Sequence, residues 1–243
     1  MQNHLENKVV VLTGAGGGIG RAVAEKLAAA KAKLILLGGN NIAKLEATAE
    51  IVKKHTSCTL LPGDLCQAGT IDGAFRKIAD EYSGIDILIN NAGTAQNTSF
   101  EEISIAEFDR IMQLNVRVPF MLIQAALPYL KKSSYAAIVN IASVVAHAGY
   151  PNQSIYTASK HALLGMTKSI AAEYFKDNIR VHAVSPGGVY TDMVKIARPD
   201  LTGEGMIMPE DIADIVHFLL ANRTNAVIDE ILVHRAGKEP FLV

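Results

Sequence analysis

The sequence predicts an α/β protein built on a doubly wound, mostly parallel seven-stranded sheet with helices on both faces. Short runs rich in Val, Ile and Leu alternate along the chain with longer stretches of helical periodicity. The runs are apolar on both faces, as strands are when helices cover both sides of a parallel sheet. Right-handed crossovers between parallel strands then give the doubly wound arrangement.

The expected elements alternate for most of the chain. Strands are expected at residues 8–13, 33–37, 58–61, 85–90, 137–141, 179–184 and 227–233. Helices are expected at residues 19–31, 43–55, 68–82, 105–130, 154–175 and 209–222. No linker, repeat or low-complexity stretch divides them, so one domain is predicted over residues 1–243. The least regular segment, 187–208, is either a mobile loop near a site or a long surface connection.

Composition and charge narrow the function classes. Apolar residues make up 49% of the 243 residues and charged residues 19%, which is enough to build a large core. The 23 Lys and Arg against 24 Asp and Glu leave no basic excess for a nucleic acid. The apolar runs are too short to span a membrane and the first residues carry no apolar signal core, so a cytoplasmic protein is expected. Cys58 and Cys66 form no CxxC pair, which fits a reducing compartment.

A glycine-rich turn ends the first expected strand, and a helix begins at once. Its sequence is Thr13-Gly14-Ala15-Gly16-Gly17-Gly18-Ile19-Gly20. Such a turn lets the backbone approach a ligand, and the helix N-terminus favours an anion such as a pyrophosphate. The spacing departs from GxGxxG, and the absence of GK[ST] excludes a P-loop. Taken alone, the turn also allows a flexible connection without a ligand.

A second group of residues is suited to proton transfer. Ser143 follows the fifth expected strand, and Tyr156 and Lys160 share one face of the next helix. A lysine cation beside a phenol favours the phenolate and so lowers the pKa of the tyrosine, which is ordinarily near ~10. The serine hydroxyl is placed to hold a carbonyl or alcohol oxygen. The three groups suit hydride transfer, although YxxxK alone is common by chance.

Together these segments resemble the short-chain dehydrogenase/reductase family. The turn matches Thr-Gly-x-x-x-Gly-x-Gly, and both Asn90-Asn91-Ala92-Gly93 and the Tyr156–Lys160 pair match further family motifs. The resemblance implies a Rossmann fold and an NAD(P)-dependent oxidoreductase that transfers a hydride between nicotinamide and a carbonyl or alcohol substrate. A dinucleotide-binding regulator without turnover is the alternative. A sugar-nucleotide epimerase or dehydratase ranks last, because it would need an additional substrate domain.

The resemblance also implies roles for individual residues. Tyr156 would be the general acid/base, Lys160 would hold the nicotinamide ribose, and Ser143 would position the substrate oxygen. Asn115 matches the asparagine that kinks the fourth helix and holds a water in the proton relay. Contacts with the dinucleotide are expected from Gly14, Gly16, Gly17, Gly18, Ile19, Gly20, Gly39, Asn40, Asp64, Leu65, Asn91, Ala92, Gly93, Tyr156, Lys160, Pro186, Gly187, Val189 and Thr191.

The end of the second expected strand departs from the family pattern and bears on cofactor choice. It is Gly38-Gly39-Asn40-Asn41, without the Asp at position 38 of NAD-using members. It also lacks the Arg at position 39, or the basic residue in place of Gly17, of NADP-using members. Backbone and amide donors are able to bind phosphate oxygens. We therefore expect NADP or NAD as cofactor with a weak preference for NADP(H), strengthened if Lys44 faces inward.

Other histidines and the C-terminal segment depart from the family as well. His182 stands where the family often has Asn, and it is expected to be a packed strand residue. His147 either faces the substrate or is a loop residue without a partner. The chain ends in residues 228–235 and 240–243 where the family often has a glycine-rich turn. The histidines lack zinc spacing and no serine lies in GxSxG, so neither a metal site nor a hydrolase is expected.

The expected partners are a small-molecule substrate and further copies of the chain. A ketone, a 3-oxoacyl thioester, a steroid and a sugar all remain open as substrates. The expected helices at 105–130 and 154–175 are rich in Ala, Leu and Ile, and in the family the equivalent helices pair across a two-fold axis. A homodimer or homotetramer is therefore expected.

Overall fold

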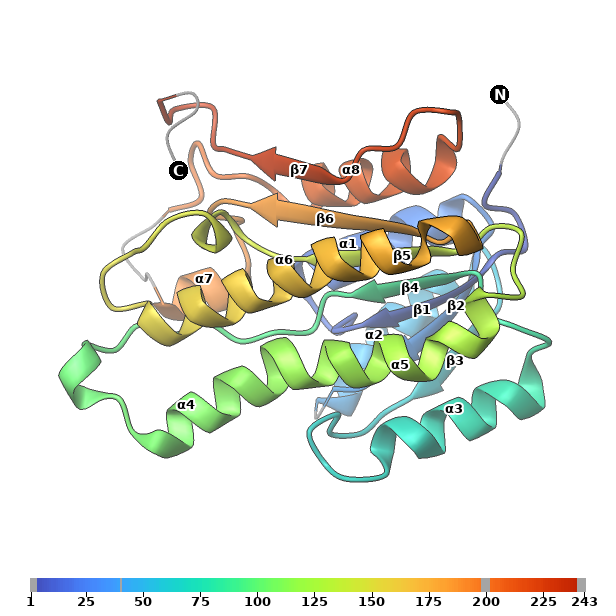
Figure 1. Cartoon of the computed structure of the whole chain (residues 1–243), viewed down its shortest axis with the longest axis horizontal. Helices are drawn as coiled ribbons and strands as arrows, with labels where there is room; N and C mark the ends of the chain where they lie inside the picture. Colours follow the sequence, from blue (N-terminus) through green and yellow to red (C-terminus); the bar gives the residue numbers. More distant parts are fainter. Residues whose placement is uncertain (1–3, 40, 198–201, 240–243) are drawn as a thin grey trace.

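A single sheet organises the computed structural model, which describes residues 4–39, 41–197 and 202–239. Its strand order is β3-β2-β1-β4-β5-β6-β7, and every neighbouring pair is parallel (Figure 1). The strands are β1 (Val9–Thr13), β2 (Lys33–Leu37), β3 (Cys58–Leu61), β4 (Ile87–Asn90), β5 (Ala137–Ile141), β6 (Arg180–Pro186) and β7 (Glu230–Val233). The predicted doubly wound, parallel arrangement is confirmed.

Helices cover both faces of the sheet (Figure 1). One face carries α1 (Gly18–Ala29), α2 (Ile42–Val52) and α8 (Pro209–Ala221). The other face carries α3 (Thr70–Glu81), α5 (Val118–Leu130) and α6 (Ser154–Tyr174). Side chains of each strand alternate between the two layers, so Val10 and Leu12 join one core and Val11 the other. This explains why the strands are apolar on both faces.

Two segments differ from the predicted elements. The helix expected at 105–130 is divided into α4 (Ile105–Met112), a π-helical segment η2 (Gln113–Arg117), and α5. Asn115 lies buried inside η2, where its side chain bonds to neighbouring segments instead of facing solvent. The segment expected to be irregular, 187–208, contains the short helix α7 (Asp192–Ala197).

The strand order places a crevice above the centre of the sheet. The chain leaves β1 toward β2 on one side, whereas β4 leads toward β5 on the other. At such a switch point the connections diverge and open a site at the carboxyl ends of the strands. The glycine-rich turn follows β1, and Asn91 follows β4, so both face this crevice. No helix among the described residues is long and apolar enough to cross a membrane.

Candidate active site

The glycine-rich turn is shaped by close approaches that allow no side chain. Gly14 has φ +71°, and a Cβ at Gly20 would lie 2.2 Å from the carbonyl oxygen of Gly14. These two glycines let α1 pack directly on the turn. A Cβ at Gly18 would lie 2.9 Å from Cγ2 of Thr191, so the segment after β6 also contacts the turn. Gly17, by contrast, has extended backbone and open space around its Cα.

Hydrogen bonds join the ends of β1 and β4. The Oγ1 of Thr13 accepts from the amides of Asn91 and Ala92, at 3.1 and 3.0 Å. The side-chain amide of Asn91 donates to the carbonyl oxygens of Thr13 and Gly14, at 3.0 and 3.2 Å. Hydrogen bonds within the chain therefore hold the turn against the NNAG segment.

A cleft of about 320 Å³ brings most of the expected residues together. It is lined by Gly14, Gly16, Gly17, Gly18, Ile19, Asn91, Ala92, Gly93, Ser143, Tyr156, Lys160, Pro186, Gly187, Val189 and Thr191. A second hollow shares Gly14, Ala92 and Gly93 with the cleft and adds Gly39, Asp64 and Leu65. Gly20 serves packing instead, and Asn40 lies outside the described residues.

Lys160 is a buried cation at the base of the cleft. Lys160 is only 5% exposed, and its Nζ donates to the carbonyl oxygen of Ile141 at 2.7 Å. The same Nζ lies 5.9 Å from the centre of the Tyr156 ring. Burial lowers the pKa of Lys160 to about 8, because the low-polarity interior penalises the charged form.

Tyr156 lies on the cleft wall beside Ser143. Burial raises the pKa of the Tyr156 phenol above its ordinary value, and the neighbouring Ser143 hydroxyl opposes this rise. The expectation that Lys160 would bring this pKa down is therefore not met, since burial has the larger effect. At neutral pH the phenol holds its proton and is ready to donate it.

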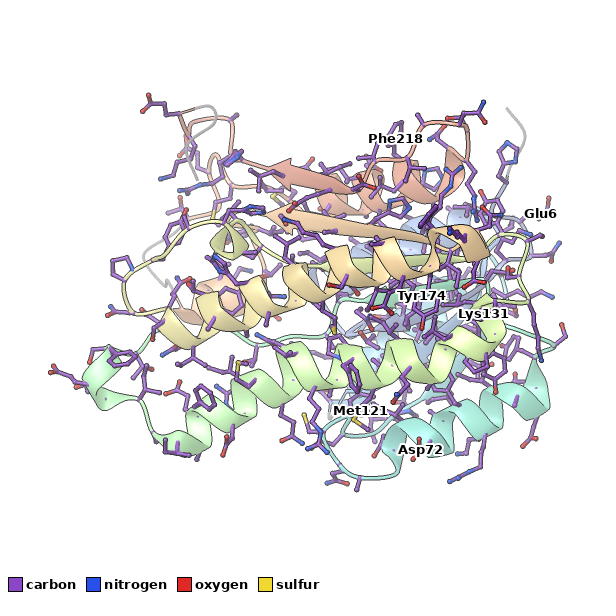
Figure 2. All side chains as sticks on the ribbon, in the orientation of Figure 1. Glu6, Asp72, Met121, Lys131, Tyr174 and Phe218 are labelled. Carbon is purple, nitrogen blue, oxygen red and sulfur yellow. The ribbon has the colours of Figure 1, made fainter. Side chains whose placement is uncertain are left out.

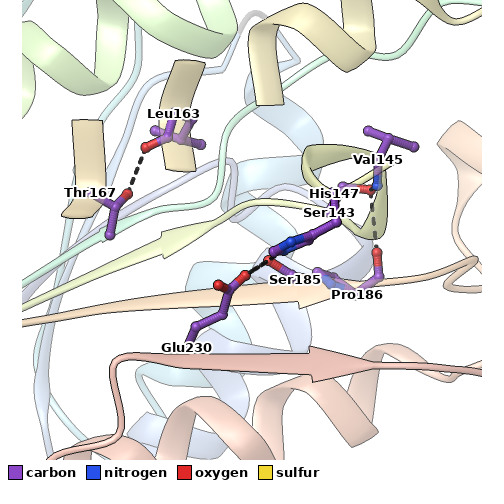
Figure 3. Close-up of polar contacts among 8 residues, drawn as sticks. All are labelled: Ser143, Val145, His147, Leu163, Thr167, Ser185, Pro186 and Glu230. Carbon is purple, nitrogen blue, oxygen red and sulfur yellow. Dashed lines mark hydrogen bonds and ion pairs between the residues drawn. The ribbon is translucent and has the colours of Figure 1, made fainter. Parts of the chain in front are cut away.

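The loop after Ser143 is anchored to the edge of the sheet, as Figure 3 shows. The Ser143 hydroxyl donates to the carbonyl oxygen of Pro186 at 3.3 Å and accepts from the amide of Val145 at 3.4 Å. Four residues after Ser143, the Nε2 of His147 lies 2.7 Å from Oε1 of Glu230 on β7. The same oxygen accepts a 2.7 Å hydrogen bond from the hydroxyl of buried Ser185 (Figure 3).

Asn115 supports the site from beneath without lining the cleft. Its Oδ1 accepts from the amide of Thr94, and its Nδ2 donates to the carbonyl oxygen of Thr94, both at 2.9 Å. Nδ2 also donates to the hydroxyl of Ser159 at 3.0 Å. The side chain therefore joins the loop after β4 to the first turns of α6. Its expected role in a proton relay stays a prediction.

The end of β2 has no room for a family-type acidic residue. Gly38 has φ +81°, and a Cβ there would lie 2.6 Å from Cγ of Leu65. Lys44 lines the cleft, although its side chain is 55% exposed, and its Nζ pairs with Oδ2 of Asp192 at 2.9 Å. This partner lowers the pKa of Asp192. The site therefore offers one cation near the turn, already paired with a carboxylate from α7.

Sequence reasoning missed several supporting residues. Thr13, Ser159 and Glu230 each make contacts that only folding brings about, across 78, 44 and 83 residues respectively. The unusual C-terminal segment was the one signal that pointed toward Glu230. His147 has a partner in this carboxylate, while His182 is a packed strand residue whose Nδ1 lies 2.6 Å from the carbonyl oxygen of Ile228.

The site fits a nicotinamide dinucleotide. The turn combines open space at Gly17 with the free amides of the α1 N-terminus, a combination suited to a pyrophosphate. The model of the short chain dehydrogenase family matches residues 8–202. The chain belongs to this family. This short-chain dehydrogenase is accordingly an NAD(P)-dependent oxidoreductase.

Relatives within the family act on different substrates. A 3alpha-hydroxysteroid dehydrogenase of Mediterraneibacter gnavus is 36% identical, over 94% of this chain and 95% of the relative. A short chain dehydrogenase of Shigella flexneri 2a str. 301, solved with NADP, is 30% identical over 96% of this chain and 99% of that one, with a TM-score of 0.88. A 3-ketoacyl-(acyl-carrier-protein) reductase of Brucella melitensis, solved with NADH, is 28% identical over 96% and 98%, with a TM-score of 0.85.

Proposed function

We propose that this short-chain dehydrogenase interconverts a carbonyl and an alcohol with Tyr156 as general acid/base. A nicotinamide dinucleotide, when bound, supplies or accepts the hydride. The Ser143 hydroxyl holds the substrate oxygen, and the Tyr156 hydroxyl gives a proton to that oxygen in reduction or takes one in oxidation. The observation that carries this proposal is that Ser143, Tyr156 and Lys160 line one cleft together with the glycine-rich turn.

Lys160 has two tasks in this scheme. Its ammonium group, held by the carbonyl oxygen of Ile141, is placed to bind a ribose hydroxyl at the base of the cleft. Its charge, 5.9 Å from the centre of the Tyr156 ring, also favours the phenolate that Tyr156 becomes after donating its proton. A lysine on the solvated surface would neither reach a ribose hydroxyl in the cleft nor favour the Tyr156 phenolate.

The dinucleotide contacts follow the cleft and the hollow beside it. The glycine-rich turn and the N-terminus of α1 face the pyrophosphate, and Asp64 and Leu65 lie where the adenine is expected. Pro186, Gly187, Val189 and Thr191 line the other side of the cleft, where they would contact the carboxamide. On this proposal one domain, residues 1–243, holds both the dinucleotide and the catalytic groups. The meeting of Ser143, Tyr156 and Lys160 at one cleft gives no support to a regulator without turnover.

A weak preference for NADP(H) is the second part of the proposal. The only cation that lines the described part of the cleft near the turn is Lys44, and a 2′-phosphate must compete with Asp192 for it. The position of Gly38 next to Leu65 leaves no room for the carboxylate that would repel this phosphate. Comparing kcat/KM for NADPH and NADH measures the preference directly.

Self-association is the third part, and we propose a homodimer or homotetramer. The outer surface of α4 and α5 carries large apolar side chains: Ile105 is 76% exposed, Phe108 39% and Phe120 50%. Met121, labelled in Figure 2, lies on the same helix as Phe120. Ile105 and Phe108 lie one turn apart on α4, and exposed apolar groups of this size are typical of an interface. Light scattering of the wild type and of Phe120→Glu gives the mass.

We further propose a cytoplasmic location, where Cys58 and Cys66 remain free thiols.

A panel of carbonyl substrates tests the catalytic proposal. The panel contains a steroid ketone, a 3-oxoacyl thioester, a cyclic diketone and a ketose, each with NADPH and NADH, and absorbance of the reduced nicotinamide is followed. Tyr156→Phe should lower kcat by about 10²–10⁴-fold and leave dinucleotide affinity within about twofold. A variant that retains most of the wild-type rate would contradict the role of Tyr156.

A further inference from the structure

The helix that carries Tyr156 and Lys160 lacks a cap from its own sequence. The first amides of any helix have no partner within the helix and need one from elsewhere. In α2 and α4 the side chains of Asn41 and Ser104 accept from first-turn amides, at 3.0 and 3.1 Å. Gln153, at the same position of α6, makes no such bond, and the first turn of α6 contains no acidic residue.

Gln96 supplies the missing cap from a distant loop. Its Oε1 accepts hydrogen bonds from the amides of Ile155 and Tyr156, at 2.9 and 3.2 Å. The residue lies 59 and 60 positions earlier in the chain, in the loop after β4, and is only 3% exposed. A buried acceptor that serves two first-turn amides fixes both the start of the helix and its rotation about its axis.

The carbonyl group of Tyr156 is held as well. The Ser159 hydroxyl donates to this carbonyl oxygen at 2.7 Å and accepts from Nδ2 of Asn115 at 3.0 Å. Asn115 in turn binds Thr94, two residues before Gln96. At the other end of the loop, the amide of Thr98 donates to the carbonyl oxygen of Asn152 at 3.0 Å. Both backbone polar groups of Tyr156 are thus fixed by side chains, and one loop connects them.

We propose that Gln96 is a positioning residue, whose side-chain oxygen caps α6 and thereby sets the place of the Tyr156 phenol opposite Ser143. The inference rests on the proposed role of Tyr156. Displacing a reacting group by as little as ~1 Å lowers reaction rates by up to ~10²-fold, so the backbone of the proton donor must be held. A glutamine on the surface would have no such effect. Gln96 is buried, and its side-chain oxygen accepts from the backbone amides of both Ile155 and Tyr156.

Two substitutions of Gln96 distinguish the effect of the capping oxygen from the effect of side-chain size. Gln96→Met keeps the length and removes the acceptor, while Gln96→Glu keeps an acceptor and places a negative charge that a helix N-terminus favours. We expect Gln96→Met to lower kcat about tenfold with the KM of the dinucleotide within about twofold, and Gln96→Glu to keep most of kcat. The assay uses the panel ketone that the wild type reduces fastest, with rates normalised to bound NADPH.

Hydrogen exchange provides a readout that needs no turnover. In Gln96→Met the amides of Ile155 and Tyr156 should exchange faster, and in Gln96→Glu they should remain protected. Ser104→Ala is the matched control: it removes a cap from α4 and should lower the melting temperature comparably without changing kcat.

The outcomes distinguish this inference from the proposed function. If Gln96→Met keeps the wild-type kcat while Tyr156→Phe loses activity, the positioning role is wrong. If Tyr156→Phe is fully active, the proposed function fails instead, and hydrogen exchange still decides whether Gln96 caps α6. Should Gln96→Met not fold, Gln96→Asn replaces it, because the shorter side chain withdraws the acceptor by one methylene. Slower turnover and faster exchange in that variant support the proposal, and unchanged values of both overturn it.

Discussion

Replacing the buried Lys160 by methionine should change how stability depends on pH. The pKa of Lys160 is lowered from 10.5 to about 8 by burial. A difference of this size corresponds to about 3 kcal/mol, at ~1.36 kcal/mol per unit. Below about pH 8 the ammonium is charged in both folded and unfolded chains, and the folded chain carries the whole penalty. Between pH 8 and 10.5 only the unfolded chain retains the proton, so stability rises with pH and then levels off.

Lys160→Met removes this penalty and with it the pH dependence. The variant also leaves the carbonyl oxygen of Ile141 without its 2.7 Å hydrogen bond, at a cost of about 1–3 kcal/mol. The two effects nearly cancel at pH 7, so both proteins should then be about equally stable, or the variant slightly more so. At pH 10.5 the penalty has disappeared from the wild type, and the variant should be the less stable by about 1–3 kcal/mol.

Urea unfolding of both proteins without dinucleotide, from pH 7 to pH 10.5, measures this difference. Other titrating groups contribute equally to both curves and cancel in the subtraction. Lys168→Met is the control, because Lys168 lies exposed on the same helix and no burial penalty is removed. A difference between wild type and Lys160→Met that stays constant over this range would refute the buried, charge-penalised lysine.

Three further predictions concern cofactor choice, the anchored loop and the direction of the reaction. Gly17→Arg should raise the NADPH/NADH ratio of kcat/KM, because the extended backbone and open space at this position accept a long cation without strain; Gly17→Met should leave the ratio unchanged. Glu230→Ala should raise the KM of the ketone more than that of the dinucleotide, since the loop after Ser143 loses its anchor. Glu230→Gln keeps an oxygen acceptor, so its KM for the ketone should stay closer to the wild-type value. The rate of alcohol oxidation should climb with pH above neutrality, because the raised pKa of Tyr156 keeps the phenol protonated and a base is needed; a rate that falls instead would contradict the assignment.

The sheet was predictable because its signals are local. A run such as Val9–Thr13 is apolar on both faces and is followed by a turn that only glycines permit, so strand, turn and helix can be inferred from one short stretch. The residues that line the cleft were predictable for a related reason. They follow strands whose carboxyl ends meet at one edge of a parallel sheet, and family motifs mark them.

The contacts that steady the site were not predictable from local patterns. Nothing near Gln96 indicates that its side chain will cap a helix 59 residues later, and Glu230 gives no sign of a partner at His147. Apolar periodicity alone predicted one continuous helix at 105–130, because the pattern continues through the π-helical segment, and only the family resemblance implied a kink at Asn115. The pKa of Tyr156 was misjudged in direction, since burial depends on the assembled cleft and spacing alone shows only the neighbouring lysine.

The position of β7 in the chain has a consequence for the order in which the enzyme matures. β7 lies beside β6, the amide of Gly187 donates to the carbonyl oxygen of Val233 at 2.8 Å, and Glu230 holds the loop that follows Ser143. Strands β1 to β4, which are followed by the glycine-rich turn and by Asn91, leave the ribosome much earlier, and chains generally begin to fold from the N-terminal side during synthesis. A nascent chain in which these strands have already folded would still lack the contacts that β7 makes with β6 and with the loop after Ser143. We therefore expect turnover to begin only once β7 has left the ribosome.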